Sequence, residues 1–128
     1  MSQTFVLFDD DTRILAGFYS LSASVVEPGT IPPGIAKKYS QHFPIPALLI
    51  ARLARHINYR GQQVGELLLV NALKRCVKVS SDVGVGMIIV DAKNEWTSTF
   101  YQRYGFTRFP DSNRLWLGMR DARRSFSG

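Results

Sequence analysis

The sequence predicts an α/β fold built on a mixed sheet with two parallel strands at its centre. Three consecutive segments indicate this. Residues 47–56 form an apolar run that ends in charges, typical of a strand buried on both faces. Residues 63–80 place apolar side chains at helical spacing opposite a basic face, and residues 87–90 form a short apolar run after two glycines. Strand, helix and strand in this order make a βαβ unit, whose strands run parallel.

The chain has 128 residues, enough for one hydrophobic core and too few for two ordinary domains. No internal repeat and no linker-like segment divides it. We therefore expect residues 1–128 to form a single domain, with its elements in the order ββ, long loop, βαβ, α, ββ.

The segments before the βαβ unit predict a hairpin followed by a long loop. Residues 4–7 and 13–26 read as extended, with three aspartates at 9–11 supplying the turn. Residues 27–46 are rich in proline and glycine and read as irregular. Side chains in this loop that suit an anionic substrate are Lys37, Lys38, Tyr39 and His42. A merely solvated loop has the same composition.

The segments after the βαβ unit predict a second helix and two last strands. Asn94 suits the N-cap of a helix over residues 95–104, and Gly105 suits its left-handed C-terminal position. The side chains expected on the buried stripe of this helix are Trp96, Phe100 and Tyr104. The strands are expected at 107–109 and 115–119.

Composition narrows the class of protein. The formal charge of +6 attracts anions, which include cofactor phosphates, RNA and acidic proteins, without choosing among them. Cys76, the single cysteine, falls in the apolar stripe of the first helix and reads as core. One cysteine and two histidines offer no convincing metal site. No secretory signal or membrane-spanning run is visible, so we expect a cytoplasmic protein without a membrane partner.

The loop before the first helix is a candidate anion site. Free backbone N–H groups and the positive end of the helix dipole favour an anion there. Gly61 and Gly65 permit close backbone approach, and Arg60 adds a positive charge. An ordinary strand-to-helix turn uses the same residue types. The loop has neither a Walker pattern nor a dinucleotide fingerprint.

Tyr101 is the candidate catalytic residue. It lies one position after Phe100 on the second helix, and therefore about 100° around it, at the edge of the expected core. A tyrosine there can donate a proton to a departing thiolate or a hydrogen bond to a thioester sulfur. A boundary tyrosine with only a packing role fits the same position.

The loop and the tyrosine together resemble the GCN5-related N-acetyltransferase (GNAT) superfamily. Its acetyl-CoA loop reads Gln/Arg-x-x-Gly-x-Gly/Ala, which Arg60 and Gly65 match. Its later helix often ends in Phe-Tyr-x-x-x-Gly-Phe, matched in full by Phe100, Tyr101, Gly105 and Phe106. The resemblance implies a GNAT-like acyl-CoA N-acyltransferase fold, a mixed sheet whose central parallel strands splay apart to admit acetyl-CoA.

Residues 5–26 and 48–65 resemble more closely the GNAT toxins of type II toxin–antitoxin systems. The resemblance implies transfer of acetyl from acetyl-CoA to the α-amine of aminoacyl-tRNA, which blocks translation, and a ribbon-helix-helix antitoxin as partner. Tyr101 would be the general acid. The residues implied to bind the cofactor are Leu53, Ala54, Arg60, Gly61, Gln62, Gln63, Val64, Gly65 and Asn94.

Two departures from the family pattern leave other functions open. Gln63 stands where the loop has its inner glycine, and its side chain either crowds the phosphates or donates to them. The N-terminal strand and helices of these toxins are also missing, so a homodimer is one way to complete the cleft. The alternatives are a GNAT acting on a small-molecule or protein amine, and a catalytically silent GNAT-fold binding module.

Overall fold

A computed structural model describes residues 2–31, 39, 43–81 except 56–63, and 84–126. The chain begins with an antiparallel hairpin of β1 (Ser2–Phe8) and β2 (Leu15–Val26). At the hairpin tip the backbone N–H of Arg13 donates to the carbonyl of Asp9, and Arg13 adopts a φ of 62°. The predicted hairpin with an aspartate-rich turn is confirmed.

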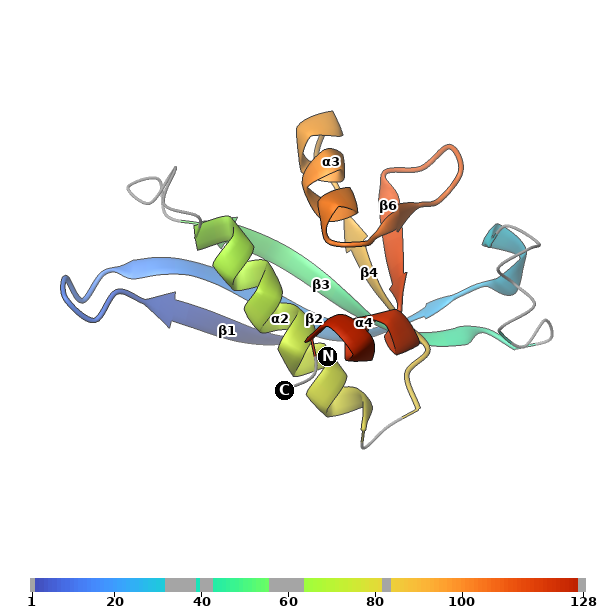
Figure 1. The fold of residues 1–128 in the computed structure, drawn as a ribbon, viewed down its shortest axis with the longest axis horizontal. Helices are drawn as coiled ribbons and strands as arrows, with labels where there is room; N and C mark the ends of the chain where they lie inside the picture. Colours follow the sequence, from blue (N-terminus) through green and yellow to red (C-terminus); the bar gives the residue numbers. More distant parts are fainter. Residues whose placement is uncertain (1, 32–38, 40–42, 56–63, 82–83, 127–128) are drawn as a thin grey trace.

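The six strands form one mixed sheet in the order β1-β2-β3-β4-β6-β5 (Figure 1). β3 (Ile45–Arg55) pairs antiparallel with β2 and parallel with β4 (Met87–Asp91). β6 (Arg114–Gly118) and the short β5 (Thr107–Arg108) complete the sheet with antiparallel pairs. The parallel strands are joined through α2 (Val64–Ser80), which confirms the predicted βαβ unit.

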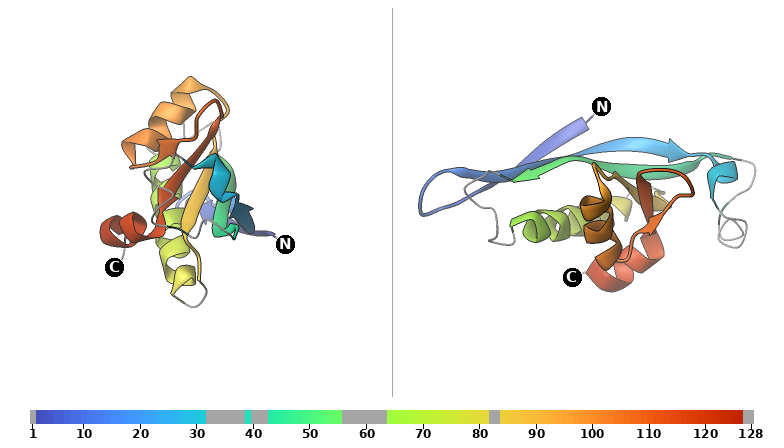
Figure 2. Two further views of the ribbon diagram at one scale, coloured as in Figure 1. Left: turned by 90° about the vertical axis from the view of Figure 1, so that its right-hand side faces the viewer. Right: turned by 90° about the horizontal axis from the view of Figure 1, so that it is seen from above.

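The α-helices cover one face of this sheet. Figure 2 shows α2, α3 (Glu95–Arg103) and α4 (Met119–Phe126) on the same side of the strands. The main core lies between them, where alternate residues of the central strands meet the apolar stripe of α2. The best-buried members from α2 and the strands are Leu68, Leu69, Ala72, Leu73, Cys76, Ile88, Val90 and Leu115. The full burial of Cys76 confirms its predicted core role and raises the pKa of its thiol to about 12.

The opposite face of β3, β4 and β6 carries a second, smaller core. Its buried members are Val26, Ile31, Ile45, Ala47, Met87, Ile89, Phe109 and Trp116. The ring centroids of Phe109 and Trp116 lie 4.7 Å apart. Ile31 follows the 3-10 turn η1 (Pro28–Thr30) and extends this cover. Because both faces are covered, these strands are apolar at successive positions rather than at alternate ones.

One polar cluster ties the hairpin to α2. The guanidinium of Arg75 lies 3.8 Å from the centroid of the Phe5 ring, and its Nε donates to the Tyr19 hydroxyl at 3.0 Å. That hydroxyl also donates to the side-chain oxygen of Asn71. The Phe5 and Tyr19 rings stack at 5.4 Å. The basic face of α2 therefore also fixes the helix against β1 and β2.

Three expectations need correction. β3 begins at Ile45, two residues before the predicted start, because the segment pairs with the end of β2. Trp96 is 66% exposed because its ring stacks on Phe100 in the wall of a cleft, and the buried residues of α3 are Ser98, Phe100 and Tyr101. Residues 119–126 form α4, which the sequence analysis did not predict.

The missed helix is short and strongly basic, which hid its pattern. Met119 and Ala122 are buried, and Phe126 packs against the main core from the same helix face. Its start is joined to β4 because the backbone N–H of Met119 donates to the carbonyl of Gly86 at 3.0 Å. Arg123 donates to the carbonyl and the hydroxyl of Ser80 at the end of α2. Among the residues that the structure describes, no helix is long and apolar enough to cross a membrane.

Candidate active site

The two parallel strands separate after a short paired stretch. β3 pairs with β4 from Ala47 opposite Met87 to Ile50 opposite Val90. Beyond that point β3 continues along β2 as far as Arg55, whereas β4 ends at Asp91. The sheet therefore opens at the carboxyl ends of its parallel strands, which is where open α/β sheets bind their ligands. The expectation of splayed central strands is confirmed.

A β-bulge lies on the β3 side of this opening. Phe18 pairs with Ala54 and Ser20 with Ala51, so two residues of β3 stand opposite the single residue Tyr19 of β2. A bulge leaves one residue out of the ladder and turns its backbone groups away from the neighbouring strand. Leu53, one of the two bulged residues, lines the opening. The bulge therefore offers backbone hydrogen-bonding groups to a ligand between the strands.

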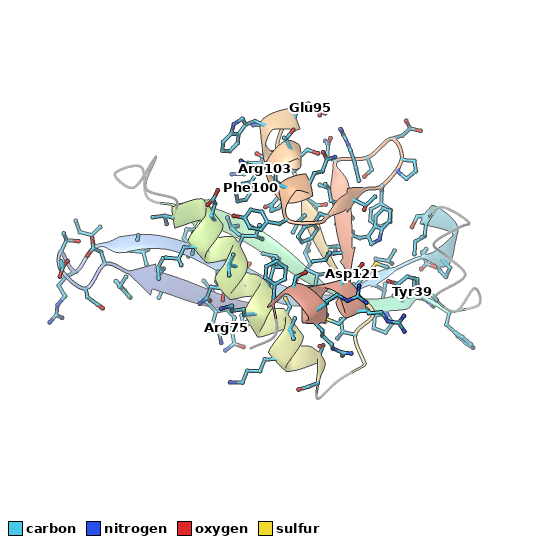
Figure 3. The ribbon with its side chains drawn as sticks, in the orientation of Figure 1. Tyr39, Arg75, Glu95, Phe100, Arg103 and Asp121 are labelled. Atoms are coloured by element: carbon cyan, nitrogen blue, oxygen red, sulfur yellow. The ribbon has the colours of Figure 1, made fainter. Side chains whose placement is uncertain are left out.

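The opening is the floor of a cleft of about 730 Å³ between the sheet, the start of α2 and one face of α3. Figure 3 shows Phe100 and Arg103 on the side of α3 that faces α2. The strands contribute Leu49, Ile50, Ala51, Leu53, Ala54 and Asp91. The helices and the turn before α3 contribute Gly65, Glu66, Lys93, Trp96, Thr97, Phe100, Tyr101 and Arg103.

Tyr101 lines this cleft, and the residue is 5% exposed. Its ring lies between those of Phe100 and Phe106, with centroids at 5.5 Å and 5.7 Å. Burial, and then the negative charge of Asp91, raise the pKa of Tyr101 to about 12. The phenol is therefore a hydrogen-bond donor throughout the physiological range, as a group that assists a leaving thiolate must be.

The first turn of α2 forms the wall opposite α3. Gly65 and Glu66 line the cleft there, where the unpaired N–H groups of a helix start favour an anion. Burial, and then the negative charge of the nearby Glu66, raise the pKa of Tyr104 on the facing helix. Arg103, on the α3 wall, supplies a positive charge to the same cleft.

The structure brings four of the predicted site residues together in the cleft, namely Leu53, Ala54, Gly65 and Tyr101. Val64 is instead 7% exposed and belongs to the main core. Four other predicted residues lie outside the described part of the chain, namely Arg60, Gly61, Gln62 and Gln63. The same holds for Lys37, Lys38 and His42. Tyr39, from that loop, packs against the second core, where burial and then Asp121 raise its pKa.

Asn94 caps the start of α3 and does not line the cleft. Its side-chain oxygen accepts from the backbone N–H of Thr97 at 2.8 Å and from the Thr97 hydroxyl at 2.9 Å. The predicted N-cap is confirmed, as is the left-handed Gly105, whose φ is 96°. Asn94 is not among the residues that line the cleft. The side chain therefore fixes the start of α3.

Replacing Asn94 by alanine should lower the free energy of unfolding by about 1 kcal/mol, because the side chain satisfies an N–H at the start of α3. Urea denaturation measures the loss. The matched control is Thr99→Ala at an exposed position of the same helix, which should be neutral or slightly stabilising since alanine is the better helix former. Equal stability of Asn94→Ala and the parent would contradict the capping role.

Several cleft residues escaped the sequence analysis, namely Glu66, Asp91, Lys93, Trp96 and Arg103. The sequence could have identified Asp91 as a site residue, because a charged residue at the carboxyl end of a parallel strand lies where ligands bind. The sequence could not have identified Trp96 as a cleft residue, because its spacing from Phe100 is also that of a buried stripe. The two rings stack with an interplanar angle of 3°.

Comparison with known proteins shows which family shares this arrangement. A tRNA-acetylating toxin of Mycobacterium tuberculosis is 32% identical over 114 residues, which cover 88% of this chain and 67% of the relative. The crystal structure of a mutant of KacT superposes with a TM-score of 0.89 and 29% identity, covering 98% of this chain and 75% of KacT. No family model matches the chain.

Two structures of AtaT are also similar. AtaT in complex with acetyl-methionyl-tRNAfMet has a TM-score of 0.86 and 26% identity, over 98% of this chain and 75% of AtaT. AtaTR bound with AcCoA has a TM-score of 0.79 and 26% identity, over 98% of this chain and 74% of the AtaTR chain. Splayed parallel strands, a bulge beside the gap and a tyrosine on the facing helix define an N-acetyltransferase of the GNAT fold. Within that class, the chain belongs to the family of tRNA-acetylating toxins.

Proposed function

We propose that residues 1–128 form one acetyltransferase domain that transfers acetyl from acetyl-CoA to the α-amine of aminoacyl-tRNA. The observation that carries the proposal is the single cleft in which Tyr101, the β3 bulge and the first turn of α2 meet. A thioester, its leaving thiolate and the phosphates of its carrier need these three kinds of group in one continuous site. The cleft volume of about 730 Å³ accommodates an extended ligand.

Acetyl-CoA would be held along the length of the cleft. The pyrophosphate would bind at the start of α2, where Gly65 lies in the wall and the loop residues Arg60, Gly61, Gln62 and Gln63 precede it. The pantetheine arm and the acetyl group would meet the backbone of Leu53 and Ala54 at the bulge. Arg103 would add its charge opposite. Val64 supports this site from the core, and Asn94 supports it by capping α3.

The reaction would proceed without a covalent enzyme intermediate. The deprotonated amine attacks the thioester carbon, an N–C bond forms and the C–S bond breaks. The Tyr101 hydroxyl donates to the sulfur as negative charge develops there, so the thiol leaves with a proton. The amine loses its remaining excess proton to solvent, from which Tyr101 is reprotonated. The products are an amide and free coenzyme A.

The choice of acceptor rests on family membership and on charge. The similar toxin of Mycobacterium tuberculosis acetylates tRNA, and AtaT is known in complex with an acetylated methionyl-tRNA. The formal charge of +6 suits a polyanionic substrate. Charged tRNA is a cytoplasmic substrate, and a reduced buried Cys76 is compatible with that compartment.

A toxin of this kind needs a neutralising partner. We infer that the partner of this chain is an antitoxin of the ribbon-helix-helix type, as the resemblance to type II systems implies. A homodimer is the proposed oligomer. Co-expression with a candidate antitoxin should restore growth to cells that the chain alone arrests, and gel filtration measures the assembly state.

Titration with acetyl-CoA tests the proposed site directly. The chain has two tryptophans, of which Trp116 is buried on the far face and Trp96 lines the cleft, so ligand binding should change the emission of Trp96. A Trp96→Phe variant should bind with little emission change, as calorimetry can verify. Absence of binding to the parent would favour a silent GNAT-fold module. Binding followed by turnover only with small-molecule or protein amines would overturn the tRNA substrate.

A further inference from the structure

The cleft passes through the plane of the sheet. Successive residues of a strand point to opposite faces. On β3, Ile50 belongs to the main core on the helix side, whereas Leu49 packs against the second core, yet both line the cleft. On β4, Val90 lies on the helix side, so Asp91 points to the other face, yet Asp91 and Tyr101 line the same cleft. The opening is therefore lined by residues whose side chains belong to both faces of the sheet.

Asp91 stands at the far rim of this opening. Its two carboxylate oxygens accept from Nε and Nη2 of Arg114 at 2.8 Å and 3.0 Å. Arg114 is its cross-strand neighbour on β6 and lines a second cavity of about 660 Å³ on that face. The apolar part of this cavity includes Val26, Ile31 and Phe109. The ion pair thus borders both the helix-side cleft, through Asp91, and a cavity on the opposite face, through Arg114.

We propose that Asp91 receives the ammonium group of the acceptor, which enters the opening from the sheet face opposite the helices. This inference rests on the proposed function and assigns the acceptor side of the same site. Asp91 is a positioning residue. Its carboxylate holds the nitrogen at the rim beside Tyr101, and the nitrogen attacks after its proton has left to solvent.

The Asp91 carboxylate keeps acceptor positions that a ligand can use. A carboxylate has about four acceptor positions, of which Arg114 occupies two in a bidentate geometry that also fixes the orientation of the group. The Asp91 side chain is 53% exposed, so an incoming ammonium can reach it. An α-amine with a pKa of about 7.7–8.0 arrives mostly charged near neutral pH, and only a charged amine needs a carboxylate there.

The test compares aminoacyl-tRNA with the same tRNA charged with the matching α-hydroxy acid, which has no ammonium group. In the parent, aminoacyl-tRNA should bind about tenfold more tightly than the hydroxyacyl form, as inhibition constants measure. In Asp91→Asn this preference should disappear, and the KM for aminoacyl-tRNA should rise about tenfold while the Kd for acetyl-CoA is unchanged. Asp91→Glu should recover part of the preference.

The matched control is Asp11→Asn, which makes the same charge change at the exposed hairpin tip, outside the cleft, and should keep the parent preference. A parent that acetylates aminoacyl-tRNA, with an unaltered preference in Asp91→Asn, would overturn the inference alone. A parent that binds acetyl-CoA without acetylating any aminoacyl-tRNA would overturn the proposed function and this inference with it.

Discussion

Tyr101→Phe should lower kcat for acetyl transfer by about 100-fold or more, because it removes the hydroxyl that meets the leaving sulfur. The aromatic ring remains packed between Phe100 and Phe106, so the fold and the affinity for acetyl-CoA should be retained. Rapid-quench measurement of acetylated aminoacyl-tRNA separates this loss in kcat from any change in KM.

The matched control is Tyr104→Phe, three residues further along the chain. This variant also loses a tyrosine hydroxyl, but Tyr104 is not among the residues that line the cleft. Its kcat should stay within about threefold of the parent, since no transition-state interaction is removed. Equal rates for Tyr101→Phe and the parent would show that Tyr101 has only a packing role.

The pH dependence follows from the protonated state of Tyr101. The rate should rise as the α-amine loses its proton, through about pH 7.7–8.0. Because burial and Asp91 raise the pKa of Tyr101 from 10.0 to about 12, the donor stays protonated well above pH 10. The plateau should therefore extend through pH 10 and fall only as pH approaches 12. An initial rate that falls near pH 10, measured while the protein remains folded and the aminoacyl ester intact, would contradict this state of Tyr101.

Leu69→Ala should lower the free energy of unfolding by about 3 kcal/mol, the second large effect we expect. Leu69 is fully buried between α2 and the sheet, and the substitution leaves a cavity in the main core. For a chain of this length the loss should lower Tm by roughly 10 °C. Calorimetry or circular dichroism measures the shift.

Leu67→Ala provides the control for the Leu69 variant. Leu67 is the same residue type on the same helix and is 55% exposed, so its truncation should cost less than about 0.5 kcal/mol. A similar loss for both variants would show that the cost arises from leucine itself and not from burial. A small loss at Leu69 would contradict the packing of α2 against the sheet.

Structural features that depend on residues close together in the chain were predictable from the sequence. The apolar run of β3, the stripe of α2 and the short run of β4 each reveal their element by periodicity, and their order implies parallel strands. The cap at Asn94 and the left-handed Gly105 depend on residues a few positions apart, and both are confirmed. Tyr101 followed from its position beside Phe100 together with the resemblance.

Features set by partners distant in sequence were not predictable in this way. Trp96 has the spacing of a buried residue, and only the tertiary structure places its ring in the cleft wall, where it stays exposed. The strongly basic composition of α4 hid a helix that becomes stable by packing its three apolar side chains on the core. Short helices gain most of their stability from such packing rather than from propensity.

The sequence by itself determined the βαβ unit, the capped second helix and the tyrosine on it, because each depends on neighbours within a turn or two of backbone. Only the tertiary structure decided where β3 parts from β4, which faces of the sheet the opening joins, and that Asp91 stands at its rim. Strand register and the bulge opposite Tyr19 arise from pairing between residues 19 to 40 positions apart, and no local pattern records them.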